Sequence, residues 1–380
     1  MIIDAQKRML ARISSTRESI SGGLPHWARP ETGEWVLTPD GDWTGGAYVG
    51  ELWLAALADP ARFTPDQAYK ALSVMLPRIE KRTAFKGFGF YFGAAVGAEL
   101  FDHEPARRAA LSAAKSLAGM FDERLGLIPL GEDAEEAASV GQAESSIDSL
   151  QATALLFWAA ENLQDETMER IASAHLRRVL EIHVRDDDSV IQSSTLDPET
   201  GRVLRTHTHK GYNDTSTWGR AQGWAMLYSA HAAMVRPQQP EWRDFAKRTI
   251  DWWIEHVPSD LVSYWDFDDP KIPAASRDTA ATSMAAAACL RLAHALGAEE
   301  GKVYREFAER TVKALSSGFL TPTSEGDRRP QGILAGGCFT QRATVRSSDA
   351  GAEDVELIFG SYFLFESLAV LAGTLSPGRV

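Results

Sequence analysis

The sequence has few cysteines and no long apolar run. Its 380 residues contain two cysteines, Cys289 and Cys338, which are too few for a disulfide framework or a cysteine-rich metal site. No stretch approaches the roughly 20 consecutive apolar residues of a membrane-spanning helix. Residues 1–21 have the pattern of a charged amphipathic helix and lack the apolar core of a signal peptide. We therefore expect a cytoplasmic protein with no membrane partner.

Basic charge is also scarce. The chain carries 39 Lys and Arg residues against 52 Asp and Glu residues, which gives a formal net charge of -13. This balance argues against a nucleic-acid partner, which normally requires a basic face. It does not exclude a small anionic substrate, because a pocket can be locally positive on an acidic protein. The sequence also lacks a glycine-rich phosphate loop after a strand and a GxSxG nucleophile motif.

What the sequence does contain is a regular alternation of two helix types. Small-residue, apolar segments follow six short polar clusters, which begin near Asp42, Gly87, Ser145, Thr215, Asp278 and Glu356. Charged amphipathic segments alternate with them, at residues 2–19, 65–81, 105–120, 166–183, 242–256 and 300–316. The first type must be packed on all sides and the second on one side. An inner ring of helices sheathed by outer ones satisfies both needs, which predicts an all-α (α/α)6 barrel.

The connections of this barrel carry two further predictions. No low-complexity stretch or Gly/Ser/Pro linker divides the chain, so we expect residues 1–380 to form a single domain. The DPETG sequence at residues 197–201 is typical of a turn between two extended pieces and predicts a minor β-hairpin in the loops. In such a barrel the polar starts of the inner helices surround one pocket.

Two of these polar starts are candidates for chemistry. In the cluster at residues 145–148, Asp148 is a candidate acid, although capping the helix is an alternative role for it and for Ser146. The cluster at residues 207–224 has more hydrogen-bonding and aromatic groups than capping requires. Its Arg220 and Trp224 are four residues apart and share a helix face, a combination that suits an anionic sugar.

Other polar residues have simpler interpretations. Asp278 is well placed to cap the fifth inner helix. His207 and His209 suggest a metal pair, but no carboxylate or third histidine accompanies them at ligand spacing, so no metal site is predicted. The glycines of the Gly87–Phe90 stretch are best explained by tight helix packing.

These residues carry a family resemblance. Residues 208–224, THKGYNDTSTWGRAQGW, resemble the signature of the unsaturated glucuronyl hydrolases, glycoside hydrolase family 88. Further matches are DWTG at 42–45, LWL at 52–54, SID at 146–148, the DPETG turn, WDFD at 265–268 and RD at 277–278. Their order and spacing run from about residue 40 to about residue 370. The WGRA piece is also similar to the unsaturated rhamnogalacturonyl hydrolases, family 105, and both families are (α/α)6 barrels.

The resemblance implies an unusual hydrolysis that needs no cofactor. Enzymes of this family act on small acidic oligosaccharides that end in a 4-deoxy-4,5-unsaturated uronic acid, the product of polysaccharide lyases. The family's acid matches Asp148, which would protonate C4 of the double bond while water adds at C5. The resulting hemiketal opens and releases the rest of the sugar. Residues that match substrate-binding positions are Trp43, Gln192, His209, Lys210, Arg220 and Trp224. The sequence does not predict an oligomeric state.

The chain departs from the family pattern in ways that bear on this acid. Gly87 stands where the family usually has a second Asp, Gln192 where it has a His, and Lys210 where it has a Gln. An Asp that acts as a general acid needs its pKa raised by roughly two units, and a second carboxylate is one way to do so. Candidates to replace the missing carboxylate are Glu144, Asp42 and Asp214. We expect Lys210 to meet an acidic group of the substrate, and therefore an altered choice of substrate.

Two other functions stay open at this stage. Loss of the carboxylate at position 87 favours a degenerate sugar-binding protein. A sugar isomerase or epimerase on the same barrel is the other alternative, although such enzymes use histidine acid/base pairs and His207 with His209 is a poor substitute.

Overall fold

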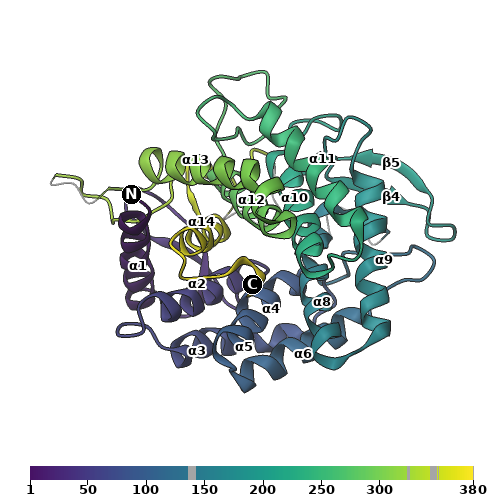
Figure 1. The fold of residues 1–380 in the computed structure, drawn as a ribbon, viewed down its shortest axis with the longest axis horizontal. Helices are drawn as coiled ribbons and strands as arrows, with labels where there is room; N and C mark the ends of the chain where they lie inside the picture. Colours follow the sequence, from purple (N-terminus) through teal and green to yellow (C-terminus); the bar gives the residue numbers. More distant parts are fainter. Residues whose placement is uncertain (136–142, 323–325, 343–348, 350, 380) are drawn as a thin grey trace.

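The helices form a closed double ring. The computed structural model describes residues 1–135, 143–322, 326–342, 349 and 351–379. Its inner helices are α2 (Gly45–Ala58), α4 (Lys86–Phe90) continued by a π-helix (Tyr91–Ala95) and α5 (Val96–Phe101), α8 (Gln151–Leu163), α10 (Gly219–Val235), α12 (Thr279–Glu300) and α14 (Ile358–Leu371). Each contacts the next, and α14 contacts α2 (Figure 1). The inner ring is therefore complete.

The outer helices alternate with the inner ones along the chain and lie outside them. They are α1 (Ile2–Ser19), α3 (Pro65–Met75) with a 3-10 turn (Leu76–Glu80), α6 (Glu104–Ala118), α9 (Glu166–His183), α11 (Pro240–His256) and α13 (Lys302–Gly318). Every residue of α10 from 219 to 233 is buried, whereas α9 buries only one stripe of its surface. The two helix types and the (α/α)6 barrel predicted from the sequence are thus confirmed. Among the described residues, no helix combines the length and apolar character that crossing a membrane requires.

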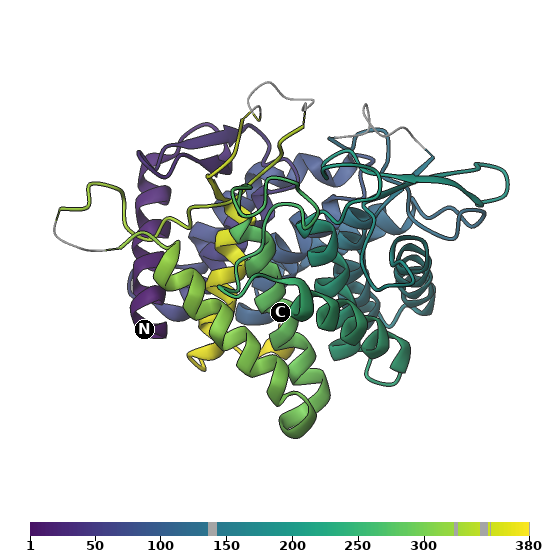
Figure 2. The same ribbon diagram turned by 90° about the horizontal axis from the view of Figure 1, so that it is seen from above.

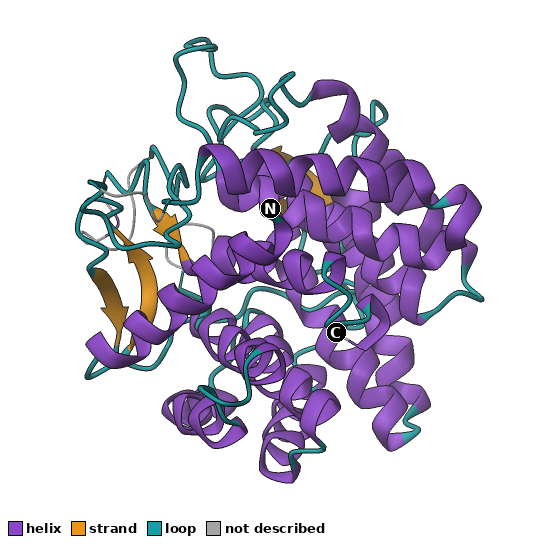
Figure 3. Ribbon diagram, turned by 60° about the vertical axis from the view of Figure 1, so that its left-hand side comes forward, coloured by secondary structure: helices purple, strands orange, loops and turns teal. Residues whose placement is uncertain are grey.

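Strands gather at one end of the ring, beside the starts of the inner helices (Figures 2 and 3). The predicted hairpin is present as β4 (Ser193–Leu196) and β5 (Val203–His207), and β3 (Glu144–Ser146) pairs with β4. A second sheet, which the sequence analysis did not predict, has the order β2 (Trp35–Thr38), β1 (Leu24–Ala28) and β6 (Glu356–Leu357). The register pairs Ser146 with Ser193 and Ser193 with His207. It therefore brings β3 beside a hairpin that lies about 50 residues further along the chain.

Glycines allow the inner helices to approach closely. A β-carbon at Gly87 would lie 2.3 Å from the carbonyl oxygen of Gln151 and 2.5 Å from the Cα of Ala152. Both are backbone atoms of α8. A β-carbon at Gly46 of α2 would lie 2.4 Å from the carbonyl oxygen of Gly89. Backbone atoms cannot move aside as a flexible side chain can. The tight packing predicted for the Gly87–Phe90 stretch is confirmed, and the position that replaces the family's second Asp has no room for a side chain.

Substitution of Gly87 tests this packing. Gly87→Ala should lower the free energy of unfolding by about 1–3 kcal/mol, because the added methyl group meets the backbone of α8. Gly89→Ala is the matched control: its β-carbon meets only the mobile end of Met75, at 3.0 Å, and alanine favours a helix by about 1 kcal/mol over glycine. Urea unfolding of both variants measures the difference. Equal stability of the two would contradict the close approach of α4 and α8.

Candidate active site

Asp148 lies at the start of the third inner helix, where β3 leads through a 3-10 turn (Ile147–Leu150) into α8. Its side chain is held on both oxygens. Trp224 Nε1 donates to Oδ1 at 3.1 Å, and Ser146 Oγ donates to Oδ2 at 2.8 Å. The cap of the turn is Ser146, whose hydroxyl accepts from the Asp148 N–H at 3.3 Å. Asp148 is therefore not used as a helix cap, and its carboxylate faces a pocket.

This pocket is narrow and has aromatic walls. Its lining residues are Trp43, Phe85, Asp148, Gln151, Lys210, Trp218, Arg220 and Trp224. Trp43 and Trp224 meet edge to face, with ring centroids 6.3 Å apart. Five of the seven residues predicted from the sequence, namely Trp43, Asp148, Lys210, Arg220 and Trp224, thus share one pocket. The other two, Gln192 and His209, are not among the lining residues. Gln192 contacts Asp148, and His209 contacts Gln192.

The side-chain amide of Gln192 joins the parts of the site. Its Oε1 accepts from the Thr208 hydroxyl at 2.7 Å and from the backbone N–H groups of His209 and Lys210, at 3.2 and 3.0 Å. These three donors fix which end of the amide is oxygen. Its Nε2 therefore donates, to Asp148 Oδ2 at 3.4 Å and to His209 Nε2 at 3.1 Å. One residue thus contacts both the carboxylate and the segment that carries Lys210.

The same amide fixes the tautomer of His209. Because Gln192 donates to its Nε2, that nitrogen is unprotonated and the ring proton is on Nδ1. Nδ1 then donates to the Ser193 hydroxyl, 3.1 Å away. Both ring nitrogens therefore have protein partners in this structure.

Lys210 brings positive charge to the pocket. Its side chain is buried, and its Nζ lies 4.1 Å from the centroid of the Phe339 ring, a cation–π contact. Lys210 and Asp148 line the same pocket.

Arg220 also reaches the pocket, but its charge is already paired. Its guanidinium donates to Asp278 at 2.5 Å and to the carbonyl oxygens of Cys338 and Phe339. Asp278 in turn accepts from the N–H groups of Ala280 and Ala281 at the start of α12, so its predicted capping role is confirmed. Burial raises the pKa of Asp278, although the adjacent Arg220 opposes the rise. Arg220 therefore ties α10 to α12 and to the chain at residues 338–339, a role that the sequence analysis did not predict.

None of the three residues suggested to replace the family's second carboxylate lines the pocket. Glu144 pairs with His207 at 2.8 Å, and Asp214 accepts from the Thr208 N–H at 3.1 Å. Asp42 accepts from the Trp43 N–H at 2.7 Å. Within the described part of the chain, Asp148 is the one carboxylate of the pocket lining.

Histidines are used structurally around this site. His207 contacts Glu144, and the described residues contain no group of three His, Cys, Asp or Glu side chains arranged to hold a metal ion. His183, at the end of α9, donates from Nδ1 to the Ile191 carbonyl at 2.8 Å and accepts from the Ser145 hydroxyl at 2.8 Å. Burial lowers the pKa of His183 to about 4, so its ring is neutral near pH 7. It therefore holds the chain shortly before Asp148, at Ser145, and just before Gln192, at Ile191.

Sequence reasoning missed several of these residues. His183 contacts Ser145 in the strand that leads to Asp148, and Phe85, Gln151 and Trp218 line the pocket. Ser146 was named from the sequence as a helix cap, a role that the structure confirms. The apolar stripe of the fourth outer helix includes His183 at its end. That signal shows that the histidine is buried, but it does not show what it contacts.

Comparison with known proteins identifies relatives along most of the chain. No family model matches the sequence. The unsaturated glucuronyl hydrolase of Bacillus sp. (strain GL1) is 29% identical over 346 residues, 88% of this chain and 87% of that protein. The unsaturated chondroitin disaccharide hydrolase of Streptococcus pneumoniae is 31% identical over 253 residues, 64% of this chain and 62% of that protein.

Solved structures agree with these relatives. The crystal structure of the unsaturated glucuronyl hydrolase from Bacillus sp. GL1 superposes with a TM-score of 0.84 at 27% identity, covering 98% of this chain and 97% of that one. The enzyme of the same name from Streptococcus agalactiae shares the fold, with a TM-score of 0.85 at 22% identity over 99% of this chain and 93% of that one. The sequence relatives, the fold and the motif residues around Asp148 agree with one another: the chain is similar to the unsaturated glucuronyl hydrolases over most of its length.

Proposed function

We propose that this protein is a glycoside hydrolase that releases a 4-deoxy-4,5-unsaturated uronic acid from the non-reducing end of small acidic oligosaccharides. The observation that carries the proposal is the placement of Asp148 in an aromatic pocket beside Lys210. The curated relatives are named unsaturated glucuronyl hydrolase and unsaturated chondroitin disaccharide hydrolase. These names favour hydrolysis over a sugar isomerase or a binding protein. We further propose that residues 1–380 act as one catalytic domain.

In this proposal Asp148 is the general acid and then the general base. Its protonated carboxyl gives a proton to C4 of the substrate's double bond, and water adds at C5. The proton lost by that water returns to the carboxylate, so that Asp148 ends as it began. The hemiketal formed at C5 opens and the glycosidic oxygen leaves with the rest of the sugar. Hydrogen bonds from Trp224, Ser146 and Gln192 aim the carboxyl and stabilise it while it is ionised.

Lys210 is the proposed partner of the substrate's carboxylate or of another acidic group. Arg220, which was predicted for this role too, lines the same pocket and forms an ion pair with Asp278. Trp43 and Trp224 offer apolar surface to the sugar. For Gln192 and His209 we propose a positioning role in place of direct substrate contact, because their polar atoms are engaged with Asp148, Ser193 and the backbone of Lys210.

Replacing Asp148 tests the acid. Asp148→Asn keeps the shape of the side chain and removes the transferable proton. Loss of the ultraviolet absorbance of the conjugated acid, followed on lyase-generated chondroitin, heparin, gellan and pectin disaccharides, should occur with the wild-type protein for at least one substrate. The variant should be at least a thousandfold slower on it, with little change in affinity. Wild-type activity that survives in Asp148→Asn would exclude Asp148 as the acid.

Lys210→Met tests the anion contact, because methionine keeps the length of the side chain without its charge. A charge-assisted hydrogen bond is worth about 1.5–3 kcal/mol, so KM for the acidic substrate should rise roughly 10–100-fold, with kcat changed far less. The methyl ester of the same unsaturated disaccharide is the control, and its KM should hardly change. An equal loss with the ester would show that Lys210 does not bind the carboxylate.

A further inference from the structure

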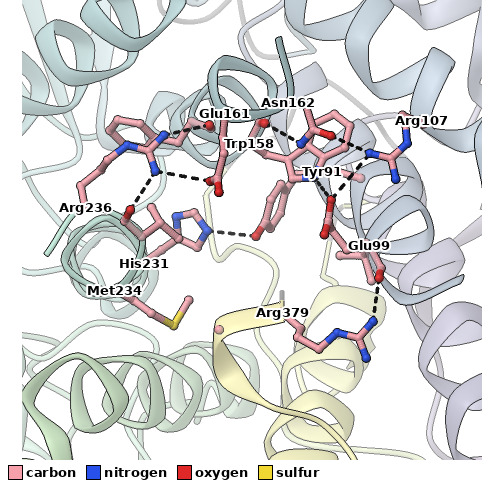
Figure 4. Close-up of a pocket in the computed structure, with 15 residues that line it drawn as sticks. Tyr91, Glu99, Arg107, Trp158, Glu161, Asn162, His231, Met234, Arg236 and Arg379 are labelled. Carbon is pink, nitrogen blue, oxygen red and sulfur yellow. Dashed lines mark hydrogen bonds and ion pairs between the residues drawn. The ribbon is translucent and has the colours of Figure 1, made fainter. Parts of the chain in front are cut away.

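A second cavity lies at the other end of the barrel, where inner helices end. The active-site residues are at the starts of α8 and α10, whereas this cavity is bordered by the ends of α5, α8 and α10 and by the chain at Gly378 and Arg379. Its volume is about 410 Å³, within the range of about 300–1,000 Å³ typical of small-molecule sites. Figure 4 shows its side chains. The site described above does not use it.

The lining of the cavity combines aromatic side chains with fixed polar groups. Tyr91, Phe157 and Trp158 supply aromatic surface. The Trp158 ring is held by a hydrogen bond from its Nε1 to Glu99 Oε1, at 2.7 Å. Apolar walls with a few placed hydrogen-bonding groups are characteristic of small-molecule sites.

The three arginines of the lining are bonded to other groups of the protein. Arg236 contacts Glu169 at 2.8 Å and the carbonyl oxygen of Phe157 at 3.0 Å. Arg107 contacts Asp102 at 3.0 Å and the amide oxygen of Asn162 at 2.6 Å. Arg379 donates to the carbonyl oxygen of Glu99 at 2.7 Å. These arginines stabilise the ends of helices, where carbonyl groups are exposed. Carboxylates pair with Arg236 and Arg107, and Arg379 bonds a carbonyl oxygen. Because all three guanidinium groups are engaged with protein acceptors, a neutral occupant is favoured.

One buried polar group in the cavity lacks a partner. His231 of α10 is 3% exposed, and its Nε2 lies 2.9 Å from the Tyr91 hydroxyl. Among the described residues, no group hydrogen-bonds to its Nδ1. Burial lowers the pKa of His231 to about 3, so the ring is neutral, with one nitrogen a donor and the other an acceptor. A hydroxyl group satisfies Nδ1 in either tautomer, because a hydroxyl both donates and accepts.

We propose that this cavity is a second binding site, separate from the active site, for a neutral, hydroxyl-rich molecule of mono- or disaccharide size. The aromatic wall of Tyr91, Phe157 and Trp158 takes its apolar face. His231 Nδ1 bonds one hydroxyl, and the carboxylate of Glu161, which contacts Arg236 at 3.7 Å, keeps acceptor capacity for another. This proposal rests on the cavity alone and does not depend on the reaction at Asp148.

Met234, which lines the cavity and is partly exposed, allows a test that removes no hydrogen bond. Met234→Trp should fill the cavity, and Met234→Leu is the matched control. The probes are D-galactose and D-glucose, with D-glucuronate as the charged comparator, and binding is measured by saturation-transfer NMR titration. At least one neutral sugar should bind the wild type at millimolar concentration and more tightly than glucuronate. Met234→Trp should weaken that binding by at least an order of magnitude, while Met234→Leu should change it less than twofold.

Controls separate this site from the active site. Lys210→Met should leave binding of the neutral sugar unchanged, and both Met234 variants should keep the melting temperature of the wild type. A crystal soaked with the sugar that binds should show it beside His231. Overturning results are absence of neutral-sugar binding to the wild type, binding that survives Met234→Trp in the folded protein, or a soaked cavity that holds water only.

Discussion

The hydrogen bonds of one side-chain amide, that of Gln192, connect the two segments that form the proposed active site. Gln192 follows the end of α9 and precedes β4, so it is positioned by helix packing on one side and by the sheet on the other. Its oxygen collects three donors from residues 208–210, and its nitrogen reaches Asp148 and His209. If this amide were lost, the buried backbone N–H groups of His209 and Lys210 would lose their shared acceptor, a costly change in a buried setting. Gln192 thus positions both the backbone of Lys210 and the carboxylate of Asp148, the proposed acid.

A second constraint comes from the close contact between inner helices. Where the family usually has a second Asp, Gly87 packs against the backbone of α8, so the missing carboxylate cannot be restored by changing this residue alone. The same helix α8 begins just after Asp148. The contact that leaves no room for a side chain at Gly87 is therefore made with the same helix that begins just after Asp148, the proposed acid. Within the described residues, the pocket lining has one carboxylate, that of Asp148, and a buried lysine, Lys210.

Much of the fold could be predicted because the helical pattern is local. Helices α1 and α9 begin and end at the predicted residues. Five of the inner helices follow the polar clusters named from the sequence, and α4 begins at Lys86, one residue before the predicted start at Gly87. The hairpin at residues 197–201 was also predictable, since its turn residues are adjacent in sequence. The β2–β1–β6 sheet was not, because its third strand lies more than 300 residues from the other two. Motif spacing likewise selected Asp148, Lys210 and Trp224. The ion pair of Arg220 with Asp278 and the hydrogen bonds of Gln192 join residues that are distant in sequence, so they could not be predicted from it.

The most direct test of the account is where the solvent proton goes. If Asp148 protonates the double bond, hydrolysis in D2O should place one deuterium at C4 of the released uronic acid, on a single face. Proton NMR of the first turnovers, before the product exchanges with solvent, should show it with the wild type, while Asp148→Asn should show no such incorporation. Release of the unsaturated sugar with its double bond intact and no deuterium at C4 would mean direct cleavage of the glycosidic bond, and it would contradict the mechanism proposed for this pocket.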